Sequence, residues 1–311
     1  MIKLGSSDIT LKVGSNDVSA AYLGNTLVYS GGTPPTPIPY DEQYLTFVAL
    51  ENGTFKFSRN SINYSLDNGS TWTTLASNTP TSIVASGEKI LWKATLTPSS
   101  NGIGTFSSTG QFDVEGNPMS LLYGDNFIGE TDLTGNNNAF YRLFYNCSKL
   151  INAENLSLPA TILATQCYYQ MFQGCTSLTE APELPATTLA NYCFYQMFQG
   201  CTSLTTAPQL PATTLVQGCY YRMFNGCTSL TMAPELPATT LAGYCYNSMF
   251  YNCTSLNYIK CLATNISAYN CTASWVSGVA ASGTFVKDAN MAGWPTGDNG
   301  IPINWTVVDN V

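Results

Sequence analysis

The stretch "CYYQMFQGC" at residues 167–175 decides how this chain folds, because the chain repeats it. Near-copies stand at 193–201 ("CFYQMFQGC"), 219–227 ("CYYRMFNGC") and 245–253 ("CYNSMFYNC"), each 26 residues after the one before. An earlier copy, "AFYRLFYNCSKLINAENLSLPATIL" at 139–163, is two residues longer and has Ala139 in place of the first cysteine. A fixed period of this size predicts an array in which each unit buries its apolar face against the next unit.

One unit can be interpreted from its own residues. In "NYCFYQMFQG" (191–200), Cys193, Met197 and Phe198 recur at the spacing of one helix face. The following "CTSLTTAPQLP" (201–211) contains two prolines, which make a long helix there implausible, so we expect an extended segment. This interpretation predicts a short helix and a strand in every unit, with the strands joined in a parallel sheet. The leucines expected to stack inward are Leu178, Leu184, Leu189 and their equivalents 26 residues on.

The unit "MFQGCTSLTEAPELPATTLANYCFYQMF" (171–198) resembles the BspA-like, Treponema-type leucine-rich repeat. Residues 139–270 match that pattern in five units, and the period of 26 lies inside the leucine-rich-repeat range but outside the tetratricopeptide and ankyrin ranges. The tail "GTFVKDANMAGWPTGDNGIPINWTVV" (283–308) resembles the closing segment of many such proteins from gut Bacteroidales and their phages. The resemblance implies a leucine-rich-repeat solenoid over residues 126–270 and a C-terminal cap over 271–311 that covers the last repeat.

The part of the chain before the repeats is predicted to be all-β. Residues 1–30 hold three short runs broken by Gly with Ser or Asn, "IKLGSSDI", "LKVGSNDV" and "AYLGNTLV", which we interpret as a β-hairpin attachment module. The alternative is that they form the first sheet of the following domain. Residues 31–39 ("GGTPPTPIP") predict a Pro-rich linker, and residues 40–125 predict a β-sandwich-like domain of short strands. The fold class expected is therefore multidomain, with N-terminal all-β modules followed by an α/β leucine-rich-repeat solenoid.

Within the predicted sandwich, "SLDNGSTW" (65–72) matches the pattern S-x-D-x-G-x-[ST]-W of an Asp-box. The resemblance implies a hairpin in which Asp67 accepts hydrogen bonds from turn amides, Gly69 takes a positive φ and Trp72 packs beneath. Sialidases contain this box, but there it is structural and remote from catalysis. A single copy therefore predicts a turn and not a glycosidase.

Composition excludes several classes of function. Charged residues make up 10% of the chain, far below the usual quarter, and the net charge is −8. No cluster of Lys and Arg is present, which argues against nucleic-acid binding. The chain has no histidine, so Ser-His-Asp and Cys-His catalytic sites and His-ligated zinc are excluded. We expect no enzymatic activity and no cofactor, and a neutral polar surface that suits contact with carbohydrate or protein.

The cellular setting is predicted from two further features. No run approaches the eighteen or more apolar residues that a membrane span needs. The opening "MIKLGSSDITLKVGSNDV" lacks the apolar core and the cleavage site of a Sec signal peptide. We therefore expect the protein to be made and folded in a cytoplasm, where thiols stay reduced.

The recurring cysteines allow four interpretations. The total of 11 is odd and cytoplasmic synthesis is reducing, which argues against a full disulfide framework, although adjacent units could bring cysteines within bonding distance. Zinc knuckles of the Cys-x2–4-Cys type are missing, and a catalytic cysteine has no His to act as its base. We therefore predict buried free thiols that fill core positions. The structural cysteines expected in the first three cysteine pairs are Cys167, Cys175, Cys193, Cys201, Cys219 and Cys227.

Residues that differ between copies on a constant frame are the candidates for ligand contact, and those flanking the predicted strand would face the concave surface. One column contains Glu180, Thr206, Met232 and Tyr258, and the next contains Glu183, Gln209, Glu235 and Cys261. On the helical side, Gln173, Gln199, Asn225 and Tyr251 run beside a stripe of Tyr169, Tyr195 and Tyr221. Exposed tyrosine offers rigid contact area at low entropic cost. The alternative is that these positions are solvated and free to vary, with the tyrosines packing along the array.

These observations favour a phage structural protein, a fibre or decoration of head or tail located in the virion. The segment "YLGNTLVY" (22–29) resembles the start of tail and fibre proteins from gut phages. The N-terminal module would dock to other virion proteins while the repeats contact a host surface glycan or protein, and a homo-oligomer such as a trimer is expected. One alternative is a BspA-like adhesin on the bacterial cell surface. The other is a glycan-cleaving enzyme that uses carboxylates such as Glu180 and Glu183.

Overall fold

The computed structural model describes residues 38–291 and 293–310, together with strand residues 12–13, 16–17, 20–23 and 26–30. The chain divides into two compact units, Met1–Pro39 and Tyr40–Val311. In the first unit, β1 (Lys12–Val13) pairs antiparallel with β2 (Asn16–Asp17), and β3 (Ala20–Leu23) pairs antiparallel with β4 (Thr26–Ser30). The other residues of the predicted attachment module, and residues 31–37 of the predicted linker, lie outside the described residues.

The second unit begins with a 3-10 helix, η1 (Tyr40–Glu42), and an antiparallel five-stranded sheet in the order β11-β5-β9-β7-β8. Its strands are β5 (Leu45–Ala49), β7 (Ile62–Ser65), β8 (Thr73–Leu75), β9 (Lys89–Lys93) and β11 (Phe112–Glu115). A separate antiparallel pair is formed by β6 (Phe55–Phe57) and β10 (Phe106–Ser108). The ring of Phe47 lies at the centre of the core, 4.8 Å from the ring centroids of Phe106 and Phe112 and 5.4 Å from that of Trp92. A short helix, α1 (Ser120–Tyr123), and the 3-10 helix η2 (Gly124–Asn126) follow.

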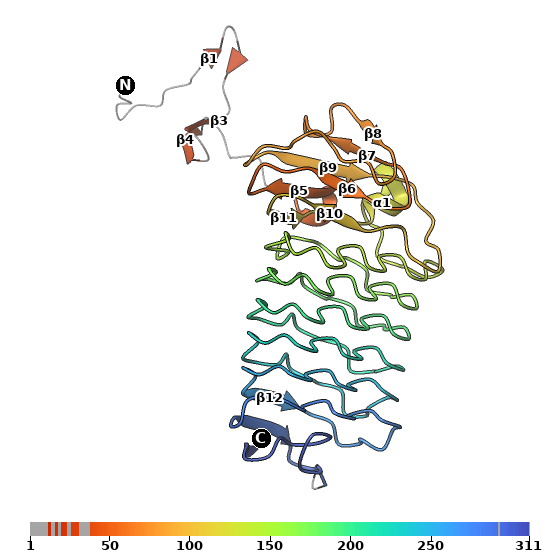
Figure 1. The fold of residues 1–311 in the computed structure, drawn as a ribbon, viewed down its shortest axis with the longest axis vertical. Helices are drawn as coiled ribbons and strands as arrows, with labels where there is room; N and C mark the ends of the chain where they lie inside the picture. Colours follow the sequence, from red (N-terminus) through yellow and green to blue (C-terminus); the bar gives the residue numbers. More distant parts are fainter. Residues whose placement is uncertain are drawn as a thin grey trace. The chain divides into compact units, whose positions relative to one another are not determined.

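The edge strand β11 joins this sheet to the first repeat unit. The amide of Val114 donates a hydrogen bond to the carbonyl of Asn152 (2.9 Å), and the amide of Ile151 donates to the carbonyl of Phe112 (2.9 Å). Parallel bridges at Phe112↔Leu150 and Gly116↔Leu156 continue the same pairing. Figure 1 shows the repeat coils following directly on β11. The sheet therefore covers the first coil and shares one hydrophobic core with it.

The repeat region is not the α/β leucine-rich-repeat solenoid that the sequence predicts, and that fold class is wrong. Within the described residues, the helices are η1, α1 and η2, and all three precede the repeats. The segments expected to be helical, such as 193–199, consist of turns, and the expected parallel sheet is reduced to isolated bridges such as Asn152↔Glu180 and Met232↔Tyr258. Each unit is a coil of turns that lies on the next coil (Figure 1). The compact unit Tyr40–Val311 therefore consists mostly of strands and turns.

Backbone conformation explains why no helix forms. Tyr192, Gln196 and Gly200 have φ of +56°, +54° and +73°, whereas every residue of an α-helix needs a negative φ near −63°. The corresponding positive-φ positions in the other coils are Asn138/Arg142/Asn146, Gln166/Gln170/Gly174, Gly218/Arg222/Gly226, Tyr244/Ser248/Asn252 and Asn270/Ser274/Gly278. A left-handed residue at every fourth position divides the segment into successive four-residue turns.

The backbone amides of these turns alternate between two kinds of partner. The amide of Met197 donates to the carbonyl of Phe194 in the same coil (3.2 Å). The amide of Phe198 donates to the carbonyl of Met223 in the next coil (2.9 Å). Half of the hydrogen bonds thus close the turns, and the other half tie each coil to the following one. In an α-helix all of them would stay within the segment.

Side chains inside the coils stack in ladders, and the C-terminal residues close the stack. The rings of Phe172, Phe198 and Phe224 lie 5.4 and 5.7 Å apart and are tilted by 3–4°. In the last coil, β12 (Tyr258–Cys261) begins a parallel sheet that continues with β13 (Thr284–Asp288) and β14 (Thr306–Asn310), in that order. The buried ring of Trp275 stacks on Trp294 at 5.6 Å and covers the end of the core.

Candidate functional site

Four of the predicted contact residues line one groove with a volume of about 380 Å³. Glu180 and Glu183 come from one coil, and Thr206 and Gln209 come from the next. Because both coils follow the same path 26 residues apart, residues at equivalent positions lie side by side. The other lining residues are Glu154, Ala181, Pro182, Leu184, Pro185, Ala207, Pro208 and Pro211.

A second hollow of about 300 Å³ continues this groove toward the start of the second unit. Glu154, Glu183 and Pro185 line both hollows, and Tyr40 and Asp41 lie in the second one. We call the two hollows together the proline groove. Sequence columns could not have found Tyr40 and Asp41, because they lie outside the repeats.

The proline groove carries unneutralised negative charge. Asp41, Glu154, Glu180 and Glu183 line it, and no Lys or Arg is present among its described lining residues. Within the described ranges, none of the four carboxylates forms an ion pair. By contrast Glu235, at the repeat position of Glu183, has its Oε1 3.2 Å from the Nζ of Lys260. The groove therefore attracts cations, whereas the equivalent site two coils on is already neutralised.

The backbone of the groove walls is open. On the wall that carries the groove residues, the amide of Ala153 donates to the carbonyl of Glu180 (3.1 Å) before the groove, and the amide of Ala233 donates to the carbonyl of Tyr258 (3.0 Å) after it. Between these points the groove amides have no hydrogen-bond partner among the described residues. They belong to Glu180, Ala181, Glu183, Leu184, Thr206, Ala207, Gln209 and Leu210. The intervening prolines have no N–H to donate and so interrupt the ladder.

The remaining members of the two columns lie beyond the groove. Met232 and Tyr258 bridge each other, and the side chain of Met232 is 57% exposed. Glu235 pairs with Lys260, and Cys261 is buried in the core. The structure thus brings the column members of the coils starting at Cys167 and Cys193 into one groove. The column members of the later coils lie outside this groove.

The tyrosine stripe is a stacked ladder. The ring of Tyr195 lies 4.3 Å from that of Tyr169 and 4.9 Å from that of Tyr221, with interplanar angles of 6° and 7°. All three side chains are half-buried. Because each inner face is covered by the next ring, these tyrosines cannot offer flat faces to a sugar. The arrangement favours a packing role for the stripe.

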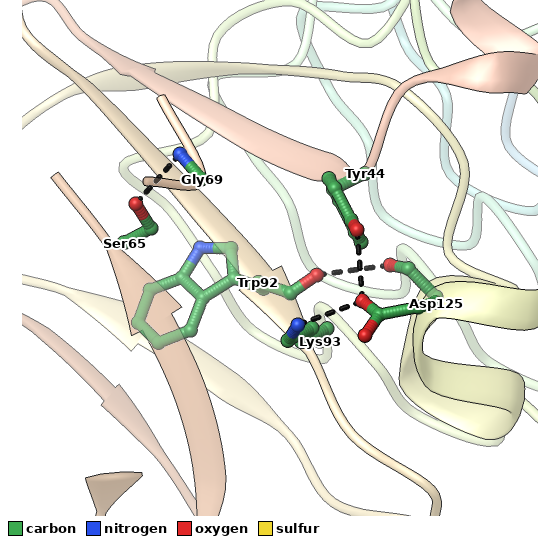
Figure 2. Close-up of polar contacts among 7 residues, drawn as sticks. Tyr44, Ser65, Gly69, Trp92, Lys93 and Asp125 are labelled. Atoms are coloured by element: carbon green, nitrogen blue, oxygen red, sulfur yellow. Dashed lines mark hydrogen bonds and ion pairs between the residues drawn. The ribbon is translucent and has the colours of Figure 1, made fainter. Parts of the chain in front are cut away.

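The Asp-box residues form a hydrogen-bonded turn. Asp67 accepts hydrogen bonds from the amide of Thr71 (2.8 Å) and from its hydroxyl (2.6 Å), which lower the pKa of Asp67 to about 2. Gly69 has φ of +87°, and its amide donates to the Oγ of Ser65 (2.8 Å), as Figure 2 shows. Asp67 is exposed, and the shallow hollow of about 230 Å³ beside it has no second carboxylate among its described lining residues, so the box shapes a hairpin.

A polar cluster beside the Asp-box was missed by the sequence interpretation. Lys93 Nζ lies 2.7 Å from Oδ1 of Asp125 and 4.2 Å from the ring centroid of Trp72. The hydroxyl of Tyr44 donates to the same Oδ1 (2.8 Å), as Figure 2 shows. Burial and this hydrogen bond raise the pKa of Tyr44 to about 12, while hydrogen bonds from Lys93 and Tyr44 lower the pKa of Asp125. The charges are mutually satisfied, so the cluster ties β9 to η2 and is not a catalytic site.

The cysteines occupy core positions. All eleven lie within the described residues as free, buried thiols. Cys201 donates from its Sγ to the carbonyl of Phe172 in the preceding coil (3.1 Å), and Cys175 donates likewise to the carbonyl of Phe144 (3.0 Å). Burial raises the pKa of Cys167 to about 12 and that of Cys147 to about 11. The thiolate, which is the reactive species, is therefore scarce at neutral pH.

Native protein is expected to react slowly with a thiol reagent such as Ellman's reagent at pH 8. Fewer than one thiol per chain should react within minutes, because burial excludes the reagent and keeps the thiols protonated. After denaturation in guanidinium, 11 thiols should titrate. A denatured count below 11 would indicate disulfides, and rapid native reaction of several thiols would contradict their burial.

Within the described ranges, no three Cys, Asp or Glu side chains are grouped so that they could hold a metal ion. In the same part of the chain, no helix combines the length and the apolar character needed to cross a membrane. Comparisons with protein-family models, with curated proteins and with solved structures find no match. The proline groove is therefore the site from which a function can be argued.

Proposed function

We propose that this chain is a non-enzymatic phage structural protein, a fibre or decoration, that binds a host surface glycan or protein through the proline groove. The observation that carries the proposal is the convergence of Glu180, Glu183, Thr206 and Gln209 on one groove. These residues vary between copies, while the aromatic and cysteine positions that build the coils recur. Variable residues gathered at one hollow on a repeated scaffold are typical of a recognition surface.

The attachment half of the proposal rests on the N-terminal unit. Met1–Pro39 is compact by itself and contains two antiparallel strand pairs. A separate small β unit suits docking to another virion protein, since such short strands bury little by themselves. The resemblance of "YLGNTLVY" to the start of phage tail and fibre proteins supports the same role.

Blocking the groove is expected to weaken host binding without affecting the fold. A Thr206→Trp substitution fills the space between the two coils, because Thr206 is an exposed lining residue. Fluorescently labelled full-length protein carrying it should bind intact host cells at least about tenfold more weakly, a loss of about 1.4 kcal/mol. Thr213→Trp is the matched control, since Thr213 is also an exposed repeat threonine but does not line the groove.

Equal binding by the Thr206→Trp and Thr213→Trp proteins would overturn the groove as the recognition site. Deletion of residues 1–30 addresses the attachment half separately. The truncated chain should fail to enter assembled particles while its urea-unfolding midpoint stays unchanged. Its incorporation would overturn residues 1–30 as the attachment module, whereas the presence of the intact protein on the surface of uninfected cells would contradict a virion role and favour the adhesin alternative.

A further inference from the structure

The proline groove has walls of two kinds, and both bear on what it binds. Carboxylates from Asp41, Glu154, Glu180 and Glu183 supply charge, and the interrupted coil-to-coil ladder leaves backbone groups unpaired. We infer that the groove takes an extended polypeptide segment bearing Lys or Arg side chains. This inference rests on the proposed function and narrows its ligand from a glycan or protein to a basic peptide.

The negative charge of the groove favours a positively charged ligand. Four carboxylates with no neutralising cation among the described residues produce a negative potential that repels acidic sugars and attracts ammonium and guanidinium groups. Within the described ranges, the carboxylates do not gather closely enough to hold a metal ion. Carboxylates distributed along a groove suit several cationic side chains at intervals better than one compact ion.

The open backbone selects a polypeptide. Between the coils starting at Cys167 and Cys193, the amides of Glu180, Ala181, Glu183 and Leu184 are unpaired within the described part of the chain. An extended peptide provides carbonyl and amide groups at regular intervals and pairs with unpaired backbone of this kind. In the neighbouring coils the corresponding wall is partly paired, since the amides of Ala153 and Ala233 donate to carbonyls of the next coil.

The lining argues against a neutral glycan. The first hollow is lined by Pro, Ala, Leu, Glu, Thr and Gln without an aromatic ring, and the described lining of the second hollow contains a single one, Tyr40. Neutral sugars gain much of their affinity by stacking their C–H faces on flat aromatic rings, and the stacked tyrosines on the other side of the coils have their inner faces covered. Proline and alanine instead contact the aliphatic stems of Lys and Arg while carboxylates meet the charged ends.

The test uses the full-length chain and two labelled octapeptides, (Lys-Thr)4 and (Glu-Thr)4, with binding followed by fluorescence anisotropy. The lysine peptide should bind and the glutamate peptide should not. Raising the salt concentration from about 0.05 to about 0.5 M should weaken the binding severalfold, because exposed charge pairs are screened. A lysine peptide in which alternate amide bonds are replaced by trans-alkene isosteres keeps its charge and extended shape but loses carbonyl acceptors for the groove amides, and it should bind at least about threefold more weakly.

Matched variants locate the binding. The double variant Glu180→Gln/Glu183→Gln should weaken binding of the lysine peptide about five- to tenfold, since each exposed charge pair contributes modestly. Glu235→Gln should stay within about twofold of the parent, because Glu235 occupies the same repeat position as Glu183 but is already paired with Lys260. Equal weakening by the two variants would show non-specific attraction and overturn the inference.

The remaining outcomes separate this inference from the proposed function. If Thr206→Trp blocks binding to host cells while no lysine peptide binds, the basic-peptide inference fails and the proposed function stands. If the protein then binds a neutral or acidic glycan on a glycan array, the ligand of the groove is a glycan and not a basic peptide. If Thr206→Trp leaves host binding unchanged, the proposed function itself fails.

Discussion

A chain that begins at residue 126, and so lacks the sheet over residues 40–125, is expected to lose the folded state of its repeat coils. β11 pairs with the first coil, as when the amide of Ile151 donates to the carbonyl of Phe112 (2.9 Å). The ring of Phe47 in the sheet also lies 5.9 Å from that of Phe144 in the first coil. Removal of the sheet would uncover Phe144 and leave the first turn of the ladder unpaired, so the end of the stack would have no cap.

The expected loss of unfolding free energy exceeds the net stability of an ordinary domain. Truncating a single buried Phe to Ala costs about 3–5 kcal/mol, and the sheet covers the first coil with several aromatic side chains. Net unfolding free energies are only about 5–15 kcal/mol. The protein spanning residues 126–311 should therefore show no cooperative urea transition by tryptophan fluorescence and should bind the dye ANS.

The control is a chain spanning residues 40–311. Met1–Pro39 is a separate compact unit, so its removal should leave the urea midpoint unchanged. If the 126–311 protein instead unfolded cooperatively with the midpoint of the 40–311 protein, the sheet would be an independent domain and not the cap of the stack.

The period of the repeat and the identity of its buried side chains could be predicted from the sequence, but the conformation of the turns could not. Buried residues at i and i+4 fit both a helix face and a chain of four-residue turns. The two differ over a longer interval, because Cys193 and Cys201, eight residues apart, would point about 80° apart on a helix. Both are fully buried in the same coil. The positive φ of Tyr192 and Gln196 has no signal in residue type, since such residues seldom adopt it without support from neighbouring coils.

The candidate site was predictable where it is built from repeat columns. Glu180, Glu183, Thr206 and Gln209 were found because the frame around them is constant. Glu154 was missed, since it belongs to the first copy, whose two extra residues break the column alignment. Asp41 was missed because more than a hundred residues separate it from the groove residues beside it, and only the folded chain brings them together.

Replacing Phe198 by alanine is expected to destabilise the second unit by about 3–5 kcal/mol. Its side chain has no exposed surface, and its ring stacks at 5.4 Å on Phe172 and at 5.7 Å on Phe224. The substitution leaves a cavity in the middle of a ladder that crosses coil boundaries, where neither neighbour can collapse without breaking its own stacking. Urea unfolding of the 40–311 protein, followed by tryptophan fluorescence, measures the effect.

Tyr195→Ala is the matched control, because Tyr195 stacks between two equivalent rings in the same coil but is half-buried. It should cost only about 1–2 kcal/mol, since it removes a smaller buried apolar area and one pair of ring contacts. Binding of host cells should be unchanged, because the tyrosine ladder has its faces covered and lies outside the proline groove. If Tyr195→Ala lost host binding with little loss of stability, the tyrosine stripe would be part of the recognition surface. If Phe198→Ala lowered the unfolding free energy by less than Tyr195→Ala does, the burial of the phenylalanine ladder would be contradicted.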